Sequence, residues 1–548
     1  MDNRATEAPK REQWSRHMEF ILTLVGYAVG LGNLWRFPYL CYKNGGGAFL
    51  LPYLLCLFLL GIPLFALETA FGQYGGYGPT RIWSINPAFK GVGLAMLVIT
   101  LVISPYYGVV ISWGVYYLVE SISFKLPWTR CSHCSCLLFD YKNYTMDQIF
   151  NRTRINCSLY EGPVRPVTEY YFQVKVLAST DSIENLGEVR WHLTLCSLLG
   201  WTFVFLTLFK GIQSLSKTSP DCWTLRDAIL VPIINSLTSI FAGFVVFAAL
   251  GHLATLQHVA VEHIVDSGPG LAFIAYPSAL SMMSLPAFWS ALFFLLFVLL
   301  GLSSQFSLVQ MLNTVALDEF PALMATSTRR LLCCLAICFS GFILGLPFLT
   351  QGGHSLLDLV DASIVGIPLL VVALFELIGL IHIYGYKNFA RDVTCMTGTR
   401  PTMFFPCWVI ISPLMIMALI VMSCVVYEPW TSRGYPYWAE GVYWGIVVAA
   451  TIPIPVYFLY RVWPRTWPLR NGFCQHIKSC MQSQPEYQQK RLEQFMIGPC
   501  PLPLQECNSA HNTVSAGSQQ REQPTDNAVD EDDIYVNNFS SLSAGALL

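Results

Sequence analysis

The sequence predicts an all-α polytopic membrane protein, and three observations lead to that prediction. Hydrophobic residues make up 54% of the 548 residues and charged residues only 12%, and a water-soluble surface cannot be built from this composition. The apolar residues gather in blocks of about 20, the length at which a helix crosses the hydrocarbon core. Lys and Arg are concentrated in alternate connections between the blocks. The net charge of −2 gives no basic excess, so we expect no nucleic-acid partner.

Ten apolar blocks are candidates for membrane spans. They lie near Phe20–Leu40, Phe49–Ala70, Gly91–Ser123, His192–Phe209, Ala228–Ala254, Ala287–Leu312, Leu331–Leu349, Leu356–Tyr384, Cys407–Val426 and Val442–Leu459. We expect a membrane domain over residues 20–470 in the lipid bilayer, preceded by a polar tail, 1–19. The polar residues 471–548, with few apolar side chains, are expected to form a disordered tail.

The basic residues predict the orientation of the chain. They precede the first and seventh spans and follow the fourth, eighth and tenth, namely Arg4, Lys10, Arg11, Arg16, Lys210, Lys217, Arg226, Arg329, Arg330, Lys387, Arg391, Arg461, Arg465 and Arg470. With ten spans, all of these connections fall on one side. Because Lys and Arg favour cytoplasmic loops, both termini are expected in the cytoplasm of a cell whose plasma membrane holds the protein.

The long polar loop at about 125–190 then lies outside. It carries three glycosylation sequons, at Asn143, Asn151 and Asn156, which agrees with the orientation that the charges predict. In an oxidising space its cysteines can form a disulfide, and the leading candidate is Cys131 paired with Cys134 or Cys136. A zinc site in the same cluster is the alternative, although the spacing is tight for one.

The sequence of the first span does not favour a continuous helix. Gly26, Gly30 and Gly32 each weaken it, and Pro38 removes a hydrogen-bond donor. We expect the helix to break near the bilayer midplane, where freed carbonyls can coordinate Na⁺ and freed N–H groups can face a carboxylate. The alternative is an unbroken helix whose small residues pack against a neighbour.

A guanidinium inside the same span also needs an explanation. Arg36 costs at least about 2.5–3.5 kcal/mol at the bilayer centre unless it is paired. Asp361, near the outer start of the eighth span, is the expected partner. Snorkelling of Arg36 to the outer interface is the alternative.

At this point the chain resembles the neurotransmitter:sodium symporter family, the sodium- and chloride-dependent solute carriers. The resemblance is carried by residues 26–39 (GYAVGLGNLWRFPY) and 44–53 (NGGGAFLLPY). It continues in order through 126–128 (LPW), 210–212 (KGI), 242–245 (AGFV), 268–273 (GPGLAF) and 301–302 (GL), over about residues 12–470. It implies the broken-helix inverted-repeat transporter fold, Na⁺ and Cl⁻ as coupling ions, and no enzymatic activity.

The resemblance also implies site residues, carried over position by position. One Na⁺ site would use Ala28, Asn33 and Asn235, and the other Gly26, Val29, Leu300, Ser303 and Ser304. Chloride would meet Tyr53 and Ser239, Tyr107 would cover the substrate and bind its carboxylate, and Arg36 and Asp361 would form the extracellular gate. Ser303 stands where animal members commonly have Asp, so one negative charge is missing from that site.

Gly30 helps to predict the substrate. Amine carriers of the family have Asp at this position, whereas Gly resembles the amino-acid carriers, whose substrate brings its own carboxylate to the Na⁺. The loop sequence at residues 187–191 (GEVRW) is more similar to that of the glycine and proline carriers. We therefore expect a small neutral amino acid as substrate, of the glycine, proline or GABA kind.

The family has twelve spans, and this chain has about ten. After residues 210–217 (KGIQSLSK), the text at 218–227 (TSPDCWTLRD) already resembles the loop before the family's seventh helix, so its fifth and sixth helices are expected to be absent. The sixth would supply half of the substrate pocket. The alternative function is therefore a transport-defective splice form, or a regulatory membrane protein that forms homo- or hetero-oligomers with full-length carriers.

Overall fold

The computed structural model describes residues 21, 24–26, 28–123, 125–129, 136–137, 165–180, 182–209, 225–257, 271–322, 324, 326–463 and 480–483. Among these residues, nine helices are long and apolar enough to cross a membrane. They correspond to the second to tenth of the expected spans, and the first is present as a helix in pieces. The prediction of an all-α polytopic fold with about ten spans is confirmed.

The helices that build the membrane part have the following bounds. They are α2 (Leu31–Leu34), α3 (Arg36–Lys43), α4 (Leu50–Cys56), α5 (Ile62–Gly75), α6 (Lys90–Ser121), α9 (Trp191–Phe209), α10 (Leu225–Gln257), α12 (Pro286–Glu319), α13 (Ser327–Gly345), α14 (Gly353–Val365), α15 (Ile367–Leu377), α16 (Tyr386–Thr397), α17 (Ser412–Val425), α18 (Tyr437–Thr451) and α19 (Pro453–Val462). π-helical turns at Leu57–Gly61 and Ile378–Gly385 join α4 to α5 and α15 to α16, and another at Cys407–Ile411 precedes α17.

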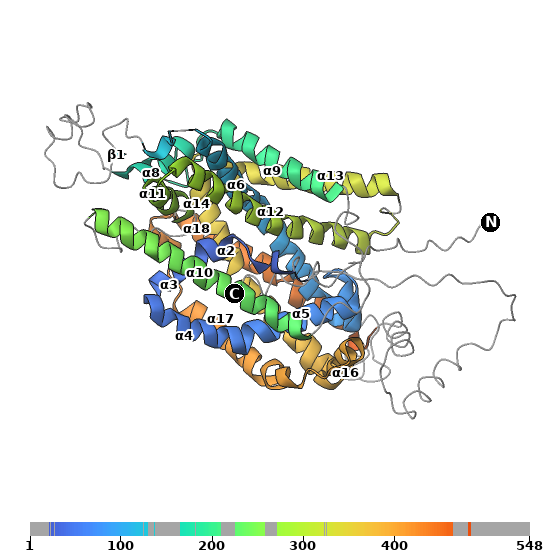
Figure 1. Ribbon diagram of the computed structural model, residues 1–548. Coiled ribbons are helices and arrows are strands. Elements are labelled where there is room, and N and C mark those ends of the chain that lie inside the picture. The colour runs from blue at the N-terminus through green and yellow to red at the C-terminus, as the bar shows by residue number, and fades with distance from the viewer. Residues whose placement is uncertain are drawn as a thin grey trace, which may run out of the picture.

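The remaining elements are short. A parallel pair of two-residue strands joins β1 (Cys136–Leu137) to β2 (Arg165–Pro166), and α8 (Val167–Tyr170) follows β2 directly. Between α10 and α12, a π-helical turn at Leu271–Ala275 leads into α11 (Tyr276–Ser281). Figure 1 shows α8, α11 and β1 at one end of the long helices, with α16 near the other end.

The scaffold of the molecule is α6, which packs along α9, α12 and α19. It is apolar on all sides, as a helix buried in a membrane protein must be. Glycine lets neighbours approach closely, since a Cβ on Gly91 would collide with the backbone of Pro453 and Ile454 in α19. The largest buried cluster includes Leu31 and Trp35, so the broken first span rests against this same core.

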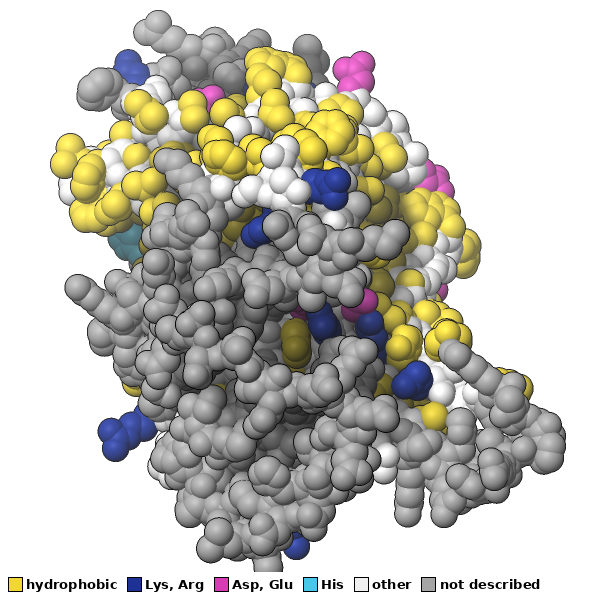
Figure 2. Space-filling model, turned by 90° about the vertical axis from the view of Figure 1, so that its right-hand side faces the viewer, with side chains coloured by type: hydrophobic (Ala, Val, Ile, Leu, Met, Phe, Trp, Pro, Cys, Tyr) yellow, Lys and Arg dark blue, Asp and Glu magenta, His cyan; other side chains and the backbone are white. Residues whose placement is uncertain are grey.

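Several basic residues lie near one end of the bundle. Arg329 and Arg330 lie at the start of α13, and Lys387 and Arg391 lie in α16, toward the right-hand side of Figure 1. Figure 2, which looks onto that side, shows Lys and Arg side chains around the described part of the surface. The strand pair and α8, which belong to the loop with the sequons, lie at the opposite end.

Candidate functional site

The first span breaks at Val29 and Gly30. Residues 24–26 and Ala28 are helical, Gly30 is extended with φ −125° and ψ −170°, and a helix resumes only at Leu31. The N–H of Gly30 donates to the Oδ1 of Asn33 at 2.9 Å, and the N–H of Asn33 donates to the carbonyl of Gly30 at 3.3 Å. In a continuous helix these two N–H groups would bond to the carbonyls of Gly26 and Val29.

Two backbone oxygens are therefore released where the helix breaks. They belong to Gly26 and Val29, two of the residues that the resemblance assigns to a Na⁺ site. The alternative of an unbroken packing helix is wrong, because Gly30 is extended and its N–H donates to the Asn33 side chain. A Cβ on Gly26 or Gly32 would also meet no described atom within 4 Å. Only Gly30 lies against a neighbour in the way a packing glycine would.

That neighbour is α12. A Cβ on Gly30 would lie 3.1 Å from the Oγ of Ser304. The hydroxyls of Ser303 and Ser304 both point to the carbonyl of Leu300, at 2.8 Å and 3.4 Å. The structure thus brings the broken segment beside the three α12 residues expected at the second Na⁺ site.

Asn33 connects the break to α10. Its Nδ2 lies 2.9 Å from the Oδ1 of Asn235, 3.2 Å from the carbonyl of Asn235 and 2.7 Å from the Oγ of Ser239. All three side chains are buried. Since an amide carries two N–H donors, it cannot satisfy three acceptors fully, and this corner is rich in oxygen.

The oxygen groups around Asn33 and those around Ser303 are of the kind that hard cations prefer. Na⁺ binds amide oxygens, hydroxyls and backbone carbonyls, and none of these has to lose a proton first. Asn33, Asn235 and the backbone near Ala28 could hold one ion. The carbonyls of Gly26, Val29 and Leu300, with Ser303 and Ser304, could hold another. The residues present therefore fit the ion that the resemblance implies.

Hydroxyl groups gather between α4 and α10. The hydroxyl of Tyr53 donates to the Oγ of Ser236 at 2.9 Å, and Ser239 lies one turn further along α10 beside Asn33. Hydroxyl and amide donors are groups that can turn toward an anion. Ser236 was missed in the sequence, although its position between Asn235 and Ser239 on one helix was a usable signal.

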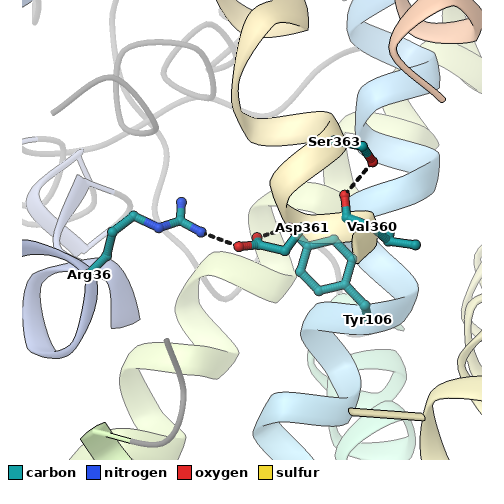
Figure 3. Close-up of polar contacts among 5 residues, drawn as sticks. All are labelled: Arg36, Tyr106, Val360, Asp361 and Ser363. Carbon is teal, nitrogen blue, oxygen red and sulfur yellow. Dashed lines mark hydrogen bonds and ion pairs between the residues drawn. The ribbon is translucent and has the colours of Figure 1, made fainter. Parts of the chain in front are cut away.

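On the C-terminal side of the break, Arg36 forms an ion pair. Its Nη2 lies 2.6 Å from the Oδ2 of Asp361 in α14, and the hydroxyl of Tyr106 donates to the other carboxylate oxygen at 2.8 Å (Figure 3). About a third of each charged side chain is exposed, 36% for Arg36 and 29% for Asp361. The expected pairing of Arg36 with Asp361 is present, and Arg36 is not left without a counter-ion.

Tyrosines on α6 line both sides of this pair. Tyr106 holds Asp361, while the hydroxyl of Tyr107 lies beside Ser304 and the backbone of Leu31. A Cβ on Gly30 would lie 3.9 Å from that hydroxyl. Tyr107, Gly30 and Ser304 thus lie close together at the break. Tyr106 was missed in the sequence, where only its neighbour was singled out.

Several expected sites lie outside the described residues. These are Cys131, Cys134 and the asparagines Asn143, Asn151 and Asn156, together with residues 210–224 between α9 and α10. Cys136 is described through its backbone, which pairs with Arg165 in the strand pair. In the part of the chain that is described, no group of three or more His, Cys, Asp or Glu could hold a metal ion.

A discontinuous membrane helix, with freed carbonyls at the break, is characteristic of secondary transporters. Comparison with known proteins gives the family. The sequence model of the sodium:neurotransmitter symporter family matches residues 11–220 and 214–465. The chain belongs to this family and is therefore not an enzyme.

Three similar proteins illustrate the relationship. The chain is 33% identical to the sodium- and chloride-dependent glycine transporter 2 of Xenopus laevis, over 89% of the chain and 73% of that protein. It is 35% identical to creatine transporter 1 of Bos taurus, over 82% of the chain and 83% of that protein. It is 34% identical to GABA transporter 2 of Rattus norvegicus, over 87% of the chain and 92% of that protein.

The family match is split in two. Its parts meet at residues 214–220, in the connection between α9 and α10. The alignment with glycine transporter 2 runs over 585 positions, more than the 548 residues of the whole chain, although it includes only 89% of them. Many of its positions are thus gaps in this chain. Residues 210–224 are also too few to cross a bilayer.

Proposed function

We propose that this chain is a sodium- and chloride-coupled symporter of a small neutral amino acid in the plasma membrane, with both termini in the cytoplasm. The observation that carries the proposal is the break at Gly30, where the N–H groups of Gly30 and Asn33 no longer bond to the carbonyls of Gly26 and Val29 and where Gly30 lies against Ser304 on α12. Na⁺ at the two oxygen-rich corners would hold the broken segment against α10 and α12. Ion binding would thereby favour one arrangement of the first span over another.

The substrate class is inferred from the residues at the break and from the names of the relatives. Glycine, creatine and GABA, the compounds in the names of the relatives, are all small molecules with a carboxylate. A carboxylate beside Gly30 could pair with Na⁺ and accept a hydrogen bond from Tyr107. No acidic side chain at position 30 meets an amine, which supports an amino acid over a monoamine.

A second candidate function rests on the split family match. If the family's fifth and sixth helices are absent, part of the pocket wall is absent too, and the chain would bind ions without completing transport. It would then act as a transport-defective form that associates with full-length carriers. The separation of the match at residues 214–220 is the observation that favours this candidate.

One experiment separates the two candidates. Na⁺-dependent uptake of radiolabelled glycine, proline and GABA is measured in cells that express this chain. Parallel cells express an insertion variant, in which the two corresponding helices of Xenopus glycine transporter 2 are placed between residues 217 and 221. Uptake by the unmodified chain supports the symporter. Uptake only after insertion supports the transport-defective form, and uptake by neither chain contradicts the proposed transport function.

A further inference from the structure

The carbonyl of Leu34, just before the second half of the broken span, has lost its helical donor. In a continuous helix it would accept the N–H of the residue four positions later, which is Pro38 and has none. The structure supplies a replacement from far away in the sequence. The hydroxyl of Tyr276 in α11 donates to the Leu34 carbonyl at 3.0 Å.

The segment that carries Tyr276 is anchored elsewhere. Phe273, three residues earlier, is fully buried, and its ring packs at 5.2–5.8 Å against rings of α6 and α12, among them Trp113, Tyr117 and Phe297. The backbone carbonyl of Phe273 accepts a hydrogen bond from the hydroxyl of Tyr117 at 3.2 Å. This part of the loop therefore belongs to the scaffold around α6.

Tyr276 connects that scaffold to the broken span. Its ring stacks on Phe293 of α12 with centroids 4.6 Å apart, while its hydroxyl reaches the Leu34 carbonyl. The ion pair of Arg36 with Asp361 is closed in the same structure, two residues beyond Leu34. The two contacts thus fix the outer half of the broken span at neighbouring points, one through charge and one through a neutral hydrogen bond.

We propose that Tyr276 is a latch residue, which holds the outer half of the first span in the closed position by replacing the donor that Pro38 lacks. The latch rests on the proposed function, because it matters only if the broken span changes position during transport. It positions backbone and does not touch substrate or ions. Its loss should raise the population of molecules in which the outer side is open.

The reporter of opening is a cysteine in place of Val110. This residue lies one helical turn from Tyr106 on the same face of α6 and is only 2% exposed in the closed structure. V110C is labelled with a membrane-impermeant thiol reagent in purified protein in choline buffer, and the labelling of the same protein without V110C is subtracted. Labelling requires neither ion binding nor uptake.

Y276F keeps the ring on Phe293 and removes the hydroxyl, so we expect V110C to be labelled about 2- to 10-fold faster, the range that one hydrogen bond of ordinary strength predicts. Y117F is the matched control. It removes a tyrosine hydroxyl that also bonds to a backbone carbonyl, but within the scaffold, and should leave the rate within about twofold of the parent. Equal rates in Y276F and the parent, or equal acceleration by Y117F, would overturn the proposal.

P38A provides a second, independent variant. It returns a backbone N–H that competes with Tyr276 for the Leu34 carbonyl, and it should accelerate labelling in the same direction. If Y276F does not fold, P38A alone tests the latch. An unchanged labelling rate of V110C in P38A would then contradict it. A repeat in Na⁺ separates the two proposals. Acceleration by Y276F without any effect of Na⁺ would retain the latch and reject the proposed ion coupling.

Discussion

A Cβ atom on Gly30 would lie 3.1 Å from the Oγ of Ser304, so the break in the first span rests directly on α12. The backbone of Gly30, at φ −125°, is open to any residue, and the need for glycine here is a matter of space alone. Since Ser304 is a candidate Na⁺ ligand, the two residues link the shape of the break to the ion site.

G30A should therefore weaken Na⁺ binding. The added methyl group must displace the Ser304 hydroxyl or the broken segment, and we expect the Na⁺ concentration for half-maximal effect to rise about tenfold, equivalent to about 1.4 kcal/mol. The measurement is thermal stabilisation of the purified protein by Na⁺ against choline, which follows binding without transport. G32A is the control, because its Cβ would meet no atom within 4 Å. Equal Na⁺ affinity in G30A and G32A would contradict the contact.

Ser303 allows a test of the charge at the second expected Na⁺ site. S303D would place a carboxylate where the hydroxyl now donates to the Leu300 carbonyl. Attraction between unit charges a few ångströms apart is worth up to about 4 kcal/mol at an effective dielectric constant near 20, less the cost of partial burial. We expect at least about tenfold tighter Na⁺ binding in the same assay. Weaker binding in S303D would place the ion elsewhere.

S303A tests the same position by removing the oxygen ligand instead of adding a charge. Removal of the hydroxyl takes away one oxygen ligand, and we expect weaker Na⁺ binding. S307A serves as its control. Ser307 lies one turn along α12, and its hydroxyl bonds to the carbonyl of Ser303 within the same helix. If S307A lowers Na⁺ affinity as much as S303A does, a general effect on α12 explains both.

The ion pair of Arg36 with Asp361 should contribute to stability. D361N keeps the shape of the side chain, removes its charge and leaves Arg36 half-buried without a counter-ion. We expect a loss of about 1–3 kcal/mol, as for hydrogen bonds to charged groups. Thermal unfolding in choline buffer measures it. E428Q, which breaks the exposed Arg433–Glu428 pair at 3.6 Å, should change stability by less than about 1 kcal/mol.

An equal loss in both variants would show that Asp361 contributes no more than a surface charge does. Y106F tests the remaining contact of that carboxylate. It removes one neutral donor to Asp361 and should cost about 1 kcal/mol.

The local parts of this architecture could be predicted from the sequence, and the distant ones could not. The break was predictable because glycines weaken a helix at their own positions, and Gly26, Gly30 and Gly32 lie around it. The pairing of Arg36 with Asp361, 325 residues away, followed from the high cost of a lone charge in the membrane. A neutral hydroxyl carries no such cost, and nothing in the sequence ties Tyr276 to Leu34, 242 residues earlier.

Ser236 escaped prediction for the same reason, and it leads to the last prediction. Its Oγ accepts the hydroxyl of Tyr53 at 2.9 Å, in the group of hydroxyls that the resemblance links to chloride. If an anion binds there, the hydroxyls of Tyr53 and Ser236 would both have to turn and donate to the ion. Y53F and S236A should therefore each weaken the effect of chloride.

The measurement is the gain in thermal stability in Na⁺ when gluconate is replaced by chloride. We expect the chloride concentration for half-maximal gain to rise at least about 10-fold in both variants, because one hydrogen bond to a charged group is worth about 1.5–3 kcal/mol. T238A is the control, because Thr238 lies on the same helix and its hydroxyl bonds to the carbonyl of Ile234 in that helix. Unchanged chloride dependence in Y53F and S236A would show that the anion does not bind between α4 and α10. A change in T238A as large as theirs would trace the effect to α10 as a whole.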